Sequence, residues 1–288
     1  GDRMIEAAAS IALVLIATGL YMWWPRGAGW RGTLVPRFSQ GRAMWKSLHG
    51  VVGIWVSAFL VLFLISGLSW AGIWGGKMVQ AWSQFPAEKW DAVPLSDDIH
   101  ASMNHHRREV PWALEQTQMP ASGSAAGEAG IAGAVTIDRI DALAREIGFD
   151  ARYQMNLPQD DTGVWTLSRD SMNTDSTDPM SDRTVHVDQH SGNILADVRY
   201  ADYSLAGKAM AVGIALHMGT LGLLSVLANT LVCLSVLFLC VSALVLWWKR
   251  RPTAAGRLSA PPMPSELPLW QGAVLVGLFV SMAFPMAG

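Results

Sequence analysis

Four long apolar runs stand out along the chain. They extend from Ile5 to Trp24, from about His49 to Trp70, through a third run that ends at Trp248, and from Leu269 to about Met286. A helix needs about 20 mainly apolar residues to cross roughly 30 Å of hydrocarbon, and these runs are close to that length and carry few charges. The pattern therefore predicts at least four transmembrane helices.

A different pattern occupies the segment between the second and third runs. Apolar residues at helical spacing follow Thr136 and end at Gly148, which predicts a short amphipathic helix. Residues 151–158, 163–170 and 183–200 alternate with the period of a strand, and residues 190–193 form a turn signal. We expect one helix packed on a small antiparallel sheet, whereas the Pro- and Gly-rich sequence before residue 136 predicts loop or extended chain.

Basic residues in two loops predict the orientation of the spans. Residues 25–46 carry five Lys and Arg and no acidic residue, and residues 249–268 carry four basic residues and one Glu. Loops of this kind lie in the cytoplasm. The segment from about Gly75 to Ser204, with 20 Asp and Glu against 10 Lys and Arg, therefore lies on the other side of the membrane.

The expected fold class is a membrane α-helical bundle with an extracytoplasmic α+β domain. Residues 1–75 hold the first two spans and a basic cytoplasmic loop, and residues 76–204 form the outer domain. Residues 205–252 form one long third helix, and residues 253–288 a cytoplasmic loop and the fourth span. Because the chain opens on Gly1 and stops directly after an apolar run, we expect residues to be missing from the N-terminus and from the C-terminus.

Composition narrows the classes of function. The chain is 51% hydrophobic and 15% charged, which indicates a lipid bilayer as its surroundings and no nucleic-acid partner. Its two cysteines, Cys233 and Cys240, lie in the third apolar run, so neither a disulfide scaffold nor a CxxCH haem attachment site is present. We find no catalytic triad, phosphate-binding glycine loop or nicotinamide fingerprint, and we expect no nucleophile or general base.

Two histidines at the ends of apolar runs are the candidate site residues. His49 in "SLHGVVG" and His217 in "ALHMGTLG" are each followed by glycine within two residues and again three residues later. Ionisable residues are uncommon within membrane spans, and neutral imidazole is a good axial ligand for haem iron. The small residues favour close approach of either a flat group or another helix.

The spacing of these histidines favours two separate sites. About 30 residues separate His217 from Trp247, which corresponds to roughly 45 Å of continuous helix and exceeds a hydrocarbon layer of about 30 Å. His217 is then expected at the outer boundary and His49 near the cytoplasmic face. Two imidazole nitrogens on one iron lie only about 4 Å apart, so each histidine marks its own haem.

Several stretches together resemble a known family. They are "TGLYMWWPR", "LHGVVG" with "LISGLSW", "VHVDQHSGNILADVRY", and "ALHMGTLG" followed by "LWWKRRP". The chain resembles the PepSY-associated transmembrane proteins of bacterial inner membranes over nearly its whole length. Within this family it resembles the iron-regulated members, including the FoxB-type siderophore reductases, and residues 135–200 resemble the PepSY-like module.

The resemblance implies a multi-pass inner-membrane oxidoreductase whose large loop is periplasmic. It would carry two haem b groups, with His49 and His217 as axial ligands of the haem iron and the partner histidines upstream of Gly1. Electrons from a quinol or a reductase would reduce a ferric hydroxamate-type siderophore and release its iron. Arg42 lies seven residues before His49, so on a continuous helix it shares that face and is a candidate partner for a haem propionate, although topology alone also explains a basic residue there.

Two other classes of function compete with this one. The spans could simply anchor a non-enzymatic PepSY-like module that binds peptide or protein, or the chain could transport a siderophore. The remaining histidines, all in the outer segment, are expected to be structural or solvated: His100, His105, His106, His186 and His190. Met155, Met172 and Met180 are spaced irregularly, which favours packing over copper binding.

Overall fold

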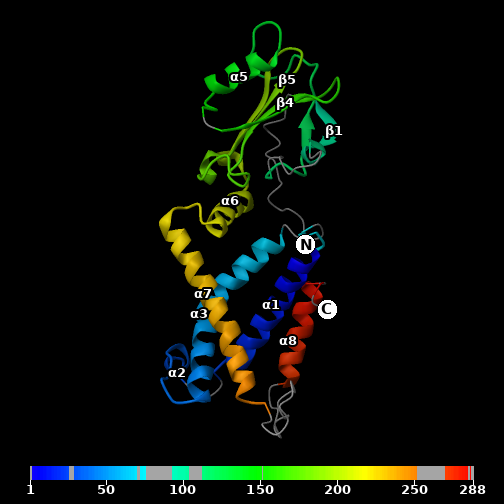
Figure 1. Cartoon of the computed structure of the whole chain (residues 1–288). Helices are drawn as coiled ribbons and strands as arrows, with labels where there is room; N and C mark the ends of the chain where they lie inside the picture. The colour runs from blue at the N-terminus through cyan, green and yellow to red at the C-terminus, as the bar shows by residue number, and fades with distance from the viewer. Residues whose placement is uncertain are drawn as a thin grey trace. The chain divides into compact units, whose positions relative to one another are not determined.

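The computed structural model describes residues 2–25, 29–69, 72–75, 93–103, 112–150, 152–251, 270–284 and 286. The chain forms two compact units (Figure 1). The helical unit comprises residues 1–79 and 226–288, and the mixed unit comprises residues 80–225.

Long apolar helices build the helical unit. Its elements are α1 (Asp2–Trp23), α2 (Arg31–Leu34), α3 (Arg42–Leu68), most of α7 (Leu223–Trp248) and α8 (Trp270–Ala283). Among the described residues, α1, α3 and α7 are long and apolar enough to cross a membrane. The 14 residues of α8 span only about 21 Å at 1.5 Å per residue, so the fourth span remains a prediction.

Side chains of α1, α3 and α8 share a small apolar core. Leu13 of α1, Leu68 of α3 and Trp74 are buried together, and side chains of α8 pack against them. The Trp74 ring stacks on Phe284 with centroids 5.6 Å apart, and its Nε1–H donates to the Ala283 carbonyl at 3.0 Å. In Figure 1, α8 accordingly runs alongside α1.

The expected single helix over residues 205–252 is wrong. The structure has α6 (Leu205–Met218) and α7, separated by a short break. Gly219 and Gly222 adopt φ of 75° and 89°, a conformation that interrupts a right-handed helix. Thr220 N–H donates to Ala215 O and Gly219 N–H to Leu216 O, the paired bonds that close many helix C-termini. The 30 residues from His217 to Trp247 therefore do not form one rod of roughly 45 Å.

The mixed unit confirms the predicted helix and sheet. The helix is α5 (Ile137–Glu146), where Thr136 Oγ1 accepts a hydrogen bond from Arg139 N–H as the N-cap. Four antiparallel strands follow in the order β3-β4-β5-β6: β3 (Gln154–Asn156), β4 (Val164–Arg169), β5 (Arg183–Asp188) and β6 (Ile194–Arg199). One face of the sheet packs on α5 through buried Leu167, Val185 and Val187.

The second face of the sheet is also buried, and it carries a row of polar side chains. Strand alternation places Thr166 and Ser168 of β4 beside Thr184 and His186 of β5, and each is at most 2% exposed. This face is covered by β1 (Leu95–Ile99), the single turn η2 (His100–Met103) and β2 (Gln118–Pro120). We refer to residues 93–103 and 112–123 as the flap. Strand pairing was not expected here, because "LSDDI" lacks the apolar alternation that marks a strand.

Candidate functional site

A hydrogen bond between two helices holds the His49 ring. His49 lies in the second turn of α3, and its Nδ1 is 2.7 Å from Oγ of Ser242, a fully buried residue of α7. The Ser242 hydroxyl donates its one hydrogen to the Leu239 carbonyl at 3.0 Å. The hydroxyl therefore accepts from His49 Nδ1–H, which assigns the tautomer and leaves the lone pair on Nε2.

The glycines after His49 serve helix packing. A Cβ added to Gly50 would lie 3.3 Å from Trp23 Cδ1, and one added to Gly53 would lie 3.7 Å from Leu239 Cδ2. The two positions therefore let α1 and α7 approach α3 closely. Of the two uses expected for small residues, close approach of another helix is the one seen at these glycines.

The donor set around His49 fits one axial position of a haem. A metal-binding imidazole usually donates its other ring N–H to a fixed acceptor, which orients the ring and raises its basicity, and Ser242 is such an acceptor. The sequence places no further histidine in residues 1–79 or 226–288. Within the described ranges, no group of three or more His, Cys, Asp or Glu residues could hold a metal ion.

Arg42 and His49 lie on one continuous helix, as the suggested role of Arg42 at a haem propionate requires. It is the first residue of α3, directly after Gly41, whose φ is 70°, and α3 runs without a break from Arg42 to His49. Seven residues correspond to about two turns, so both side chains lie on roughly one face of α3.

His217 lies in the last turn of α6 and is exposed. It belongs to the mixed unit, whereas His49 belongs to the helical unit. Of the glycines that follow His217, Gly219 ends α6 with a positive φ. At this histidine, the glycine pattern marks a helix terminus.

Sequence reasoning missed a buried carboxylate in α1. Glu6 is 1% exposed, and its carboxylate oxygens accept hydrogen bonds from Trp74 N–H at 2.7 Å and Ile73 N–H at 3.2 Å. The carboxylate thus ties α1 to the turn that follows α3. The sequence did contain an indication of this carboxylate. Glu6 lies one position inside an apolar run, where charged residues are uncommon and require partners. The same contacts make Trp74 a core residue of the helical unit.

A buried histidine pair in the mixed unit was also missed. His100 and His186 are both 0% exposed, and their Nε2 atoms lie 3.0 Å apart. Burial lowers the pKa of His100 to about 4, against a smaller opposing effect of its hydrogen bond to Thr117. Burial first, and the charge of His100 second, lower the pKa of His186 well below its usual range. Both rings are therefore neutral at pH 7.

Two other histidines of the outer segment, His105 and His106, lie outside the described residues.

Two buried carboxyls near the end of β4 have raised pKa values. Burial first, and the neighbouring Asp182 second, raise the pKa of Asp170 to about 7. Burial raises the pKa of Asp182 to about 6, although hydrogen bonds from Ser171 N–H and Oγ–H lower it. Such groups change charge close to neutral pH, which sequence spacing alone does not reveal.

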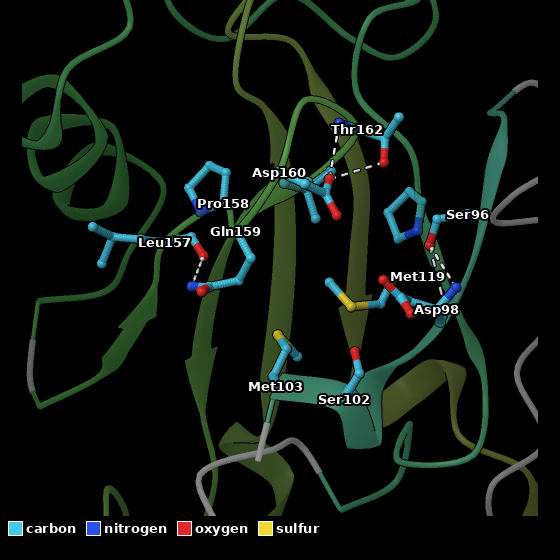
Figure 2. A pocket seen from close by; sticks show the side chains of 13 residues that line it. Ser96, Asp98, Ser102, Met103, Met119, Leu157, Pro158, Gln159, Asp160 and Thr162 are labelled. Atoms are coloured by element: carbon cyan, nitrogen blue, oxygen red, sulfur yellow. Dashed lines mark hydrogen bonds between the residues drawn. The ribbon is translucent and has the colours of Figure 1, made fainter. Parts of the chain in front are cut away.

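A groove of about 280 Å³ opens between the flap and the loop that joins β3 to β4 (Figure 2). The thioethers of Met103 and Met119 lie in its lining, and Asp98 and Asp160 add carboxylates. Asp160 accepts hydrogen bonds from Thr162 N–H and Oγ1–H, both at 2.9 Å. Neither His49 nor His217 lines this groove.

Three long apolar helices and a separate α+β unit define the class of this chain as a membrane protein that also contains a folded mixed unit. A family model described as "PepSY-associated TM region" matches residues 1–250, and the chain belongs to this family. Neither the curated proteins nor the solved structures yield a match to the chain.

Proposed function

We propose that the protein is a haem b-containing oxidoreductase of the bacterial inner membrane. It passes electrons across the membrane to a ferric hydroxamate-type siderophore on the periplasmic side, where the iron is released. The observation that carries this proposal is the His49 imidazole, held inside a transmembrane helix by Ser242 with Nε2 free of that contact. Membership of the PepSY-associated transmembrane family supports it.

Haem in such a site supplies reversible one-electron chemistry. His49 and His217 would each hold one haem iron through an imidazole nitrogen, and Arg42 would pair with a propionate. Ser242 keeps the proton on Nδ1 of His49, so that the lone pair stays on Nε2. One electron from a quinol or reductase converts chelated Fe³⁺ to Fe²⁺, which hard oxygen ligands hold less tightly. No nucleophile takes part.

The proposed topology follows the loop charges. Residues 25–46 and the basic segment after α7 face the cytoplasm, and the mixed unit lies in the periplasm as a PepSY-like module. Four spans in this chain, and partner histidines from outside it, complete the proposed core.

The test is a reduction assay with full-length protein in nanodiscs. Reduced protein is mixed with a ferric hydroxamate chelate, and haem reoxidation is recorded together with Fe²⁺ capture by a ferrous-specific dye. We expect stoichiometric Fe²⁺ from wild type, none from His49→Ala, and wild-type behaviour from His190→Gln. The gallium chelate, which cannot be reduced, should leave the haem reduced. Wild type that binds haem yet yields no Fe²⁺ would refute siderophore reduction.

A second candidate is a non-enzymatic binding protein anchored by its spans. The groove in the mixed unit favours this candidate, because its lining combines apolar and polar side chains, as ligand-binding sites commonly do. Full-length protein that folds without haem and without a Soret band would favour this candidate over the reductase.

A further inference from the structure

Four residues form a continuous hydrogen-bonded chain between the flap and the sheet. Thr166 Oγ1 of β4 is 3.0 Å from Nδ1 of His186, and His186 Nε2 is 3.0 Å from Nε2 of His100. His100 Nδ1 is 2.8 Å from the Thr117 carbonyl and 3.1 Å from Thr117 Oγ1. The chain thus runs from the sheet, through both rings, into the flap.

The direction of each hydrogen bond in this chain follows from its ends. The Thr117 carbonyl can only accept, and Thr117 Oγ1 donates its hydrogen to Leu114 O, so His100 Nδ1 carries a proton. In a neutral ring His100 Nε2 is then an acceptor, and His186 Nε2–H donates to it. His186 Nδ1 accepts from the Thr166 hydroxyl. One proton lies between the two Nε2 atoms, and the closed arrangement requires both rings to be neutral.

A further proton disrupts this arrangement at either ring. On His100 Nε2 it would set two N–H groups against each other across 3.0 Å. On His186 Nδ1 the Thr166 hydroxyl could turn to accept it, but a cation would remain buried in a site that is 0% exposed. Taking such a cation out of water into a fully buried position is unfavourable.

Several carboxylates lie on the elements that surround the histidine pair. Asp188 shares the His186 face of β5, and it accepts from the N–H groups of Gly123, His190 and Ser191. These bonds outweigh its burial and keep the pKa of Asp188 below the usual range. Asp197 of β6 pairs with Arg183 and Arg199. Asp97 and Asp98 are exposed, and Glu115 is half-buried. Asp170 is buried and accepts hydrogen bonds from Trp112 N–H and Met172 N–H.

Other contacts of the flap lie on either side of the histidine pair, and Met119 of the flap also packs in an apolar cluster with Val164 and Leu195. At one end, Ser122 N–H donates to the Thr162 carbonyl and Gly123 N–H donates to Asp188. At the other end, Trp112 N–H donates to Asp170 over a longer distance of 3.4 Å. Between them, His100 reaches the buried polar face of the sheet. The same segment carries Ser96, Asp98, Ser102 and Met103, which form one wall of the groove in Figure 2.

We propose that the His100–His186 pair is an acid-sensitive latch, which fastens the flap to the polar face of the sheet and releases it when the pair takes up a proton. Release exposes this face and widens the groove between the flap and the loop after β3. The latch belongs to the mixed unit alone and is independent of haem binding.

Proton linkage sets the size of the effect. In the open flap the rings are hydrated and titrate near the ordinary histidine pKa of about 6.5, whereas burial holds the pKa of His100 at about 4 in the closed form. Between these values, the opening equilibrium rises about tenfold for each pH unit per proton taken up. We therefore expect flap opening to increase by about tenfold from pH 6 to pH 5 for one proton, and by up to about a hundredfold for two.

Hydrogen–deuterium exchange of the full-length protein in nanodiscs tests the latch. Rates at pH 7, 6 and 5 are corrected for the intrinsic pH dependence of exchange, and peptides covering 93–103 are compared with those covering α5. We expect protection in 93–103 to fall by about tenfold or more between pH 6 and pH 5 while α5 stays protected. His190→Gln, which alters an exposed histidine bonded to the Asp161 carbonyl, should leave this profile unchanged.

The double variant His100→Gln and His186→Gln separates the latch from Asp170 and Asp182. Its flap should exchange faster at pH 7 and lose the step between pH 6 and pH 5, and any response from the two carboxyls should remain. Should this variant fail to fold, nitrogen NMR of labelled histidines in wild type reports the same event as simultaneous protonation and flap exchange. Flap protection that is constant from pH 7 to pH 5, or a step that survives in the folded double variant, would overturn the proposal.

Discussion

Replacing Ser242 by alanine tests the hydrogen bond that orients the His49 ring. The substitution removes the acceptor 2.7 Å from Nδ1 and leaves that N–H facing a fully buried position. A neutral hydrogen bond contributes about 0.5–1.5 kcal/mol, which corresponds to about 2- to 13-fold in a dissociation constant. We expect haem to dissociate faster from Ser242→Ala by a factor in this range, because the ring is less well oriented and its second tautomer becomes accessible.

The assay is transfer of haem from nanodisc-embedded protein to excess apomyoglobin, followed in the Soret region. Ser235→Ala is the matched control, since it removes a hydroxyl from the same helix that donates to the Leu231 carbonyl at 2.8 Å. Identical transfer rates for the two variants would refute the role assigned to Ser242.

Three further outcomes are expected from the structure. Asp182 has a folded-state pKa of about 6, above its ordinary 3.8, so its contribution to stability is present below pH 4 and is lost as pH rises through 6. Thermal unfolding should accordingly show Asp182→Asn more stable than wild type at pH 8, by up to about 3 kcal/mol, and similar at pH 4. Glu6→Ala leaves two backbone N–H groups without their acceptor and should lower the stability of detergent-solubilised protein by about 2–5 kcal/mol. Glu6→Gln should have an intermediate stability. An unchanged melting temperature of Glu6→Ala would contradict this prediction. Gly219→Ala, at φ 75°, should destabilise by about 1–2 kcal/mol, whereas Gly213→Ala, in mid-helix with open space around its Cβ, should stabilise slightly in the same assay.

The regular elements were predictable because their signals are local. Residues 137–147 carry a helical period with a cap and a glycine stop, and residues 183–200 carry strand alternation around a turn, so α5, β5 and β6 could be placed. The apolar runs likewise predicted α1, α3 and α7, because length and hydropathy are enough to identify a span.

The failures arose where an apolar pattern hides backbone geometry. Residues 205–248 are mainly apolar, and hydropathy does not distinguish a continuous helix from two helices joined at Gly219 and Gly222. The positive φ values at these glycines end α6, although their spacing after His217 had suggested close approach of a flat group or helix. The corresponding glycines after His49 do serve helix packing.

The buried polar contacts could not be predicted, because each joins distant parts of the chain. His100 and His186 are 86 positions apart, and Glu6 is bonded 68 positions away at Trp74. Strand alternation places the His186 side chain on the other face of the sheet from Val185 and Val187. It does not show that a second histidine contacts His186 from the flap. His49 was identified from its location in a span, whereas its partner Ser242 lies among several serines of α7 that look equivalent in sequence.

The haem content of full-length protein tests the central claim most directly. Pyridine haemochrome stoichiometry and the low-spin spectrum are measured for wild type, His49→Ala and His217→Ala, with His190→Gln as a control. The account predicts two b-type haems in wild type and the loss of one in each of the first two variants. Wild-type haem content in His49→Ala, or correctly folded wild type without haem, would contradict it.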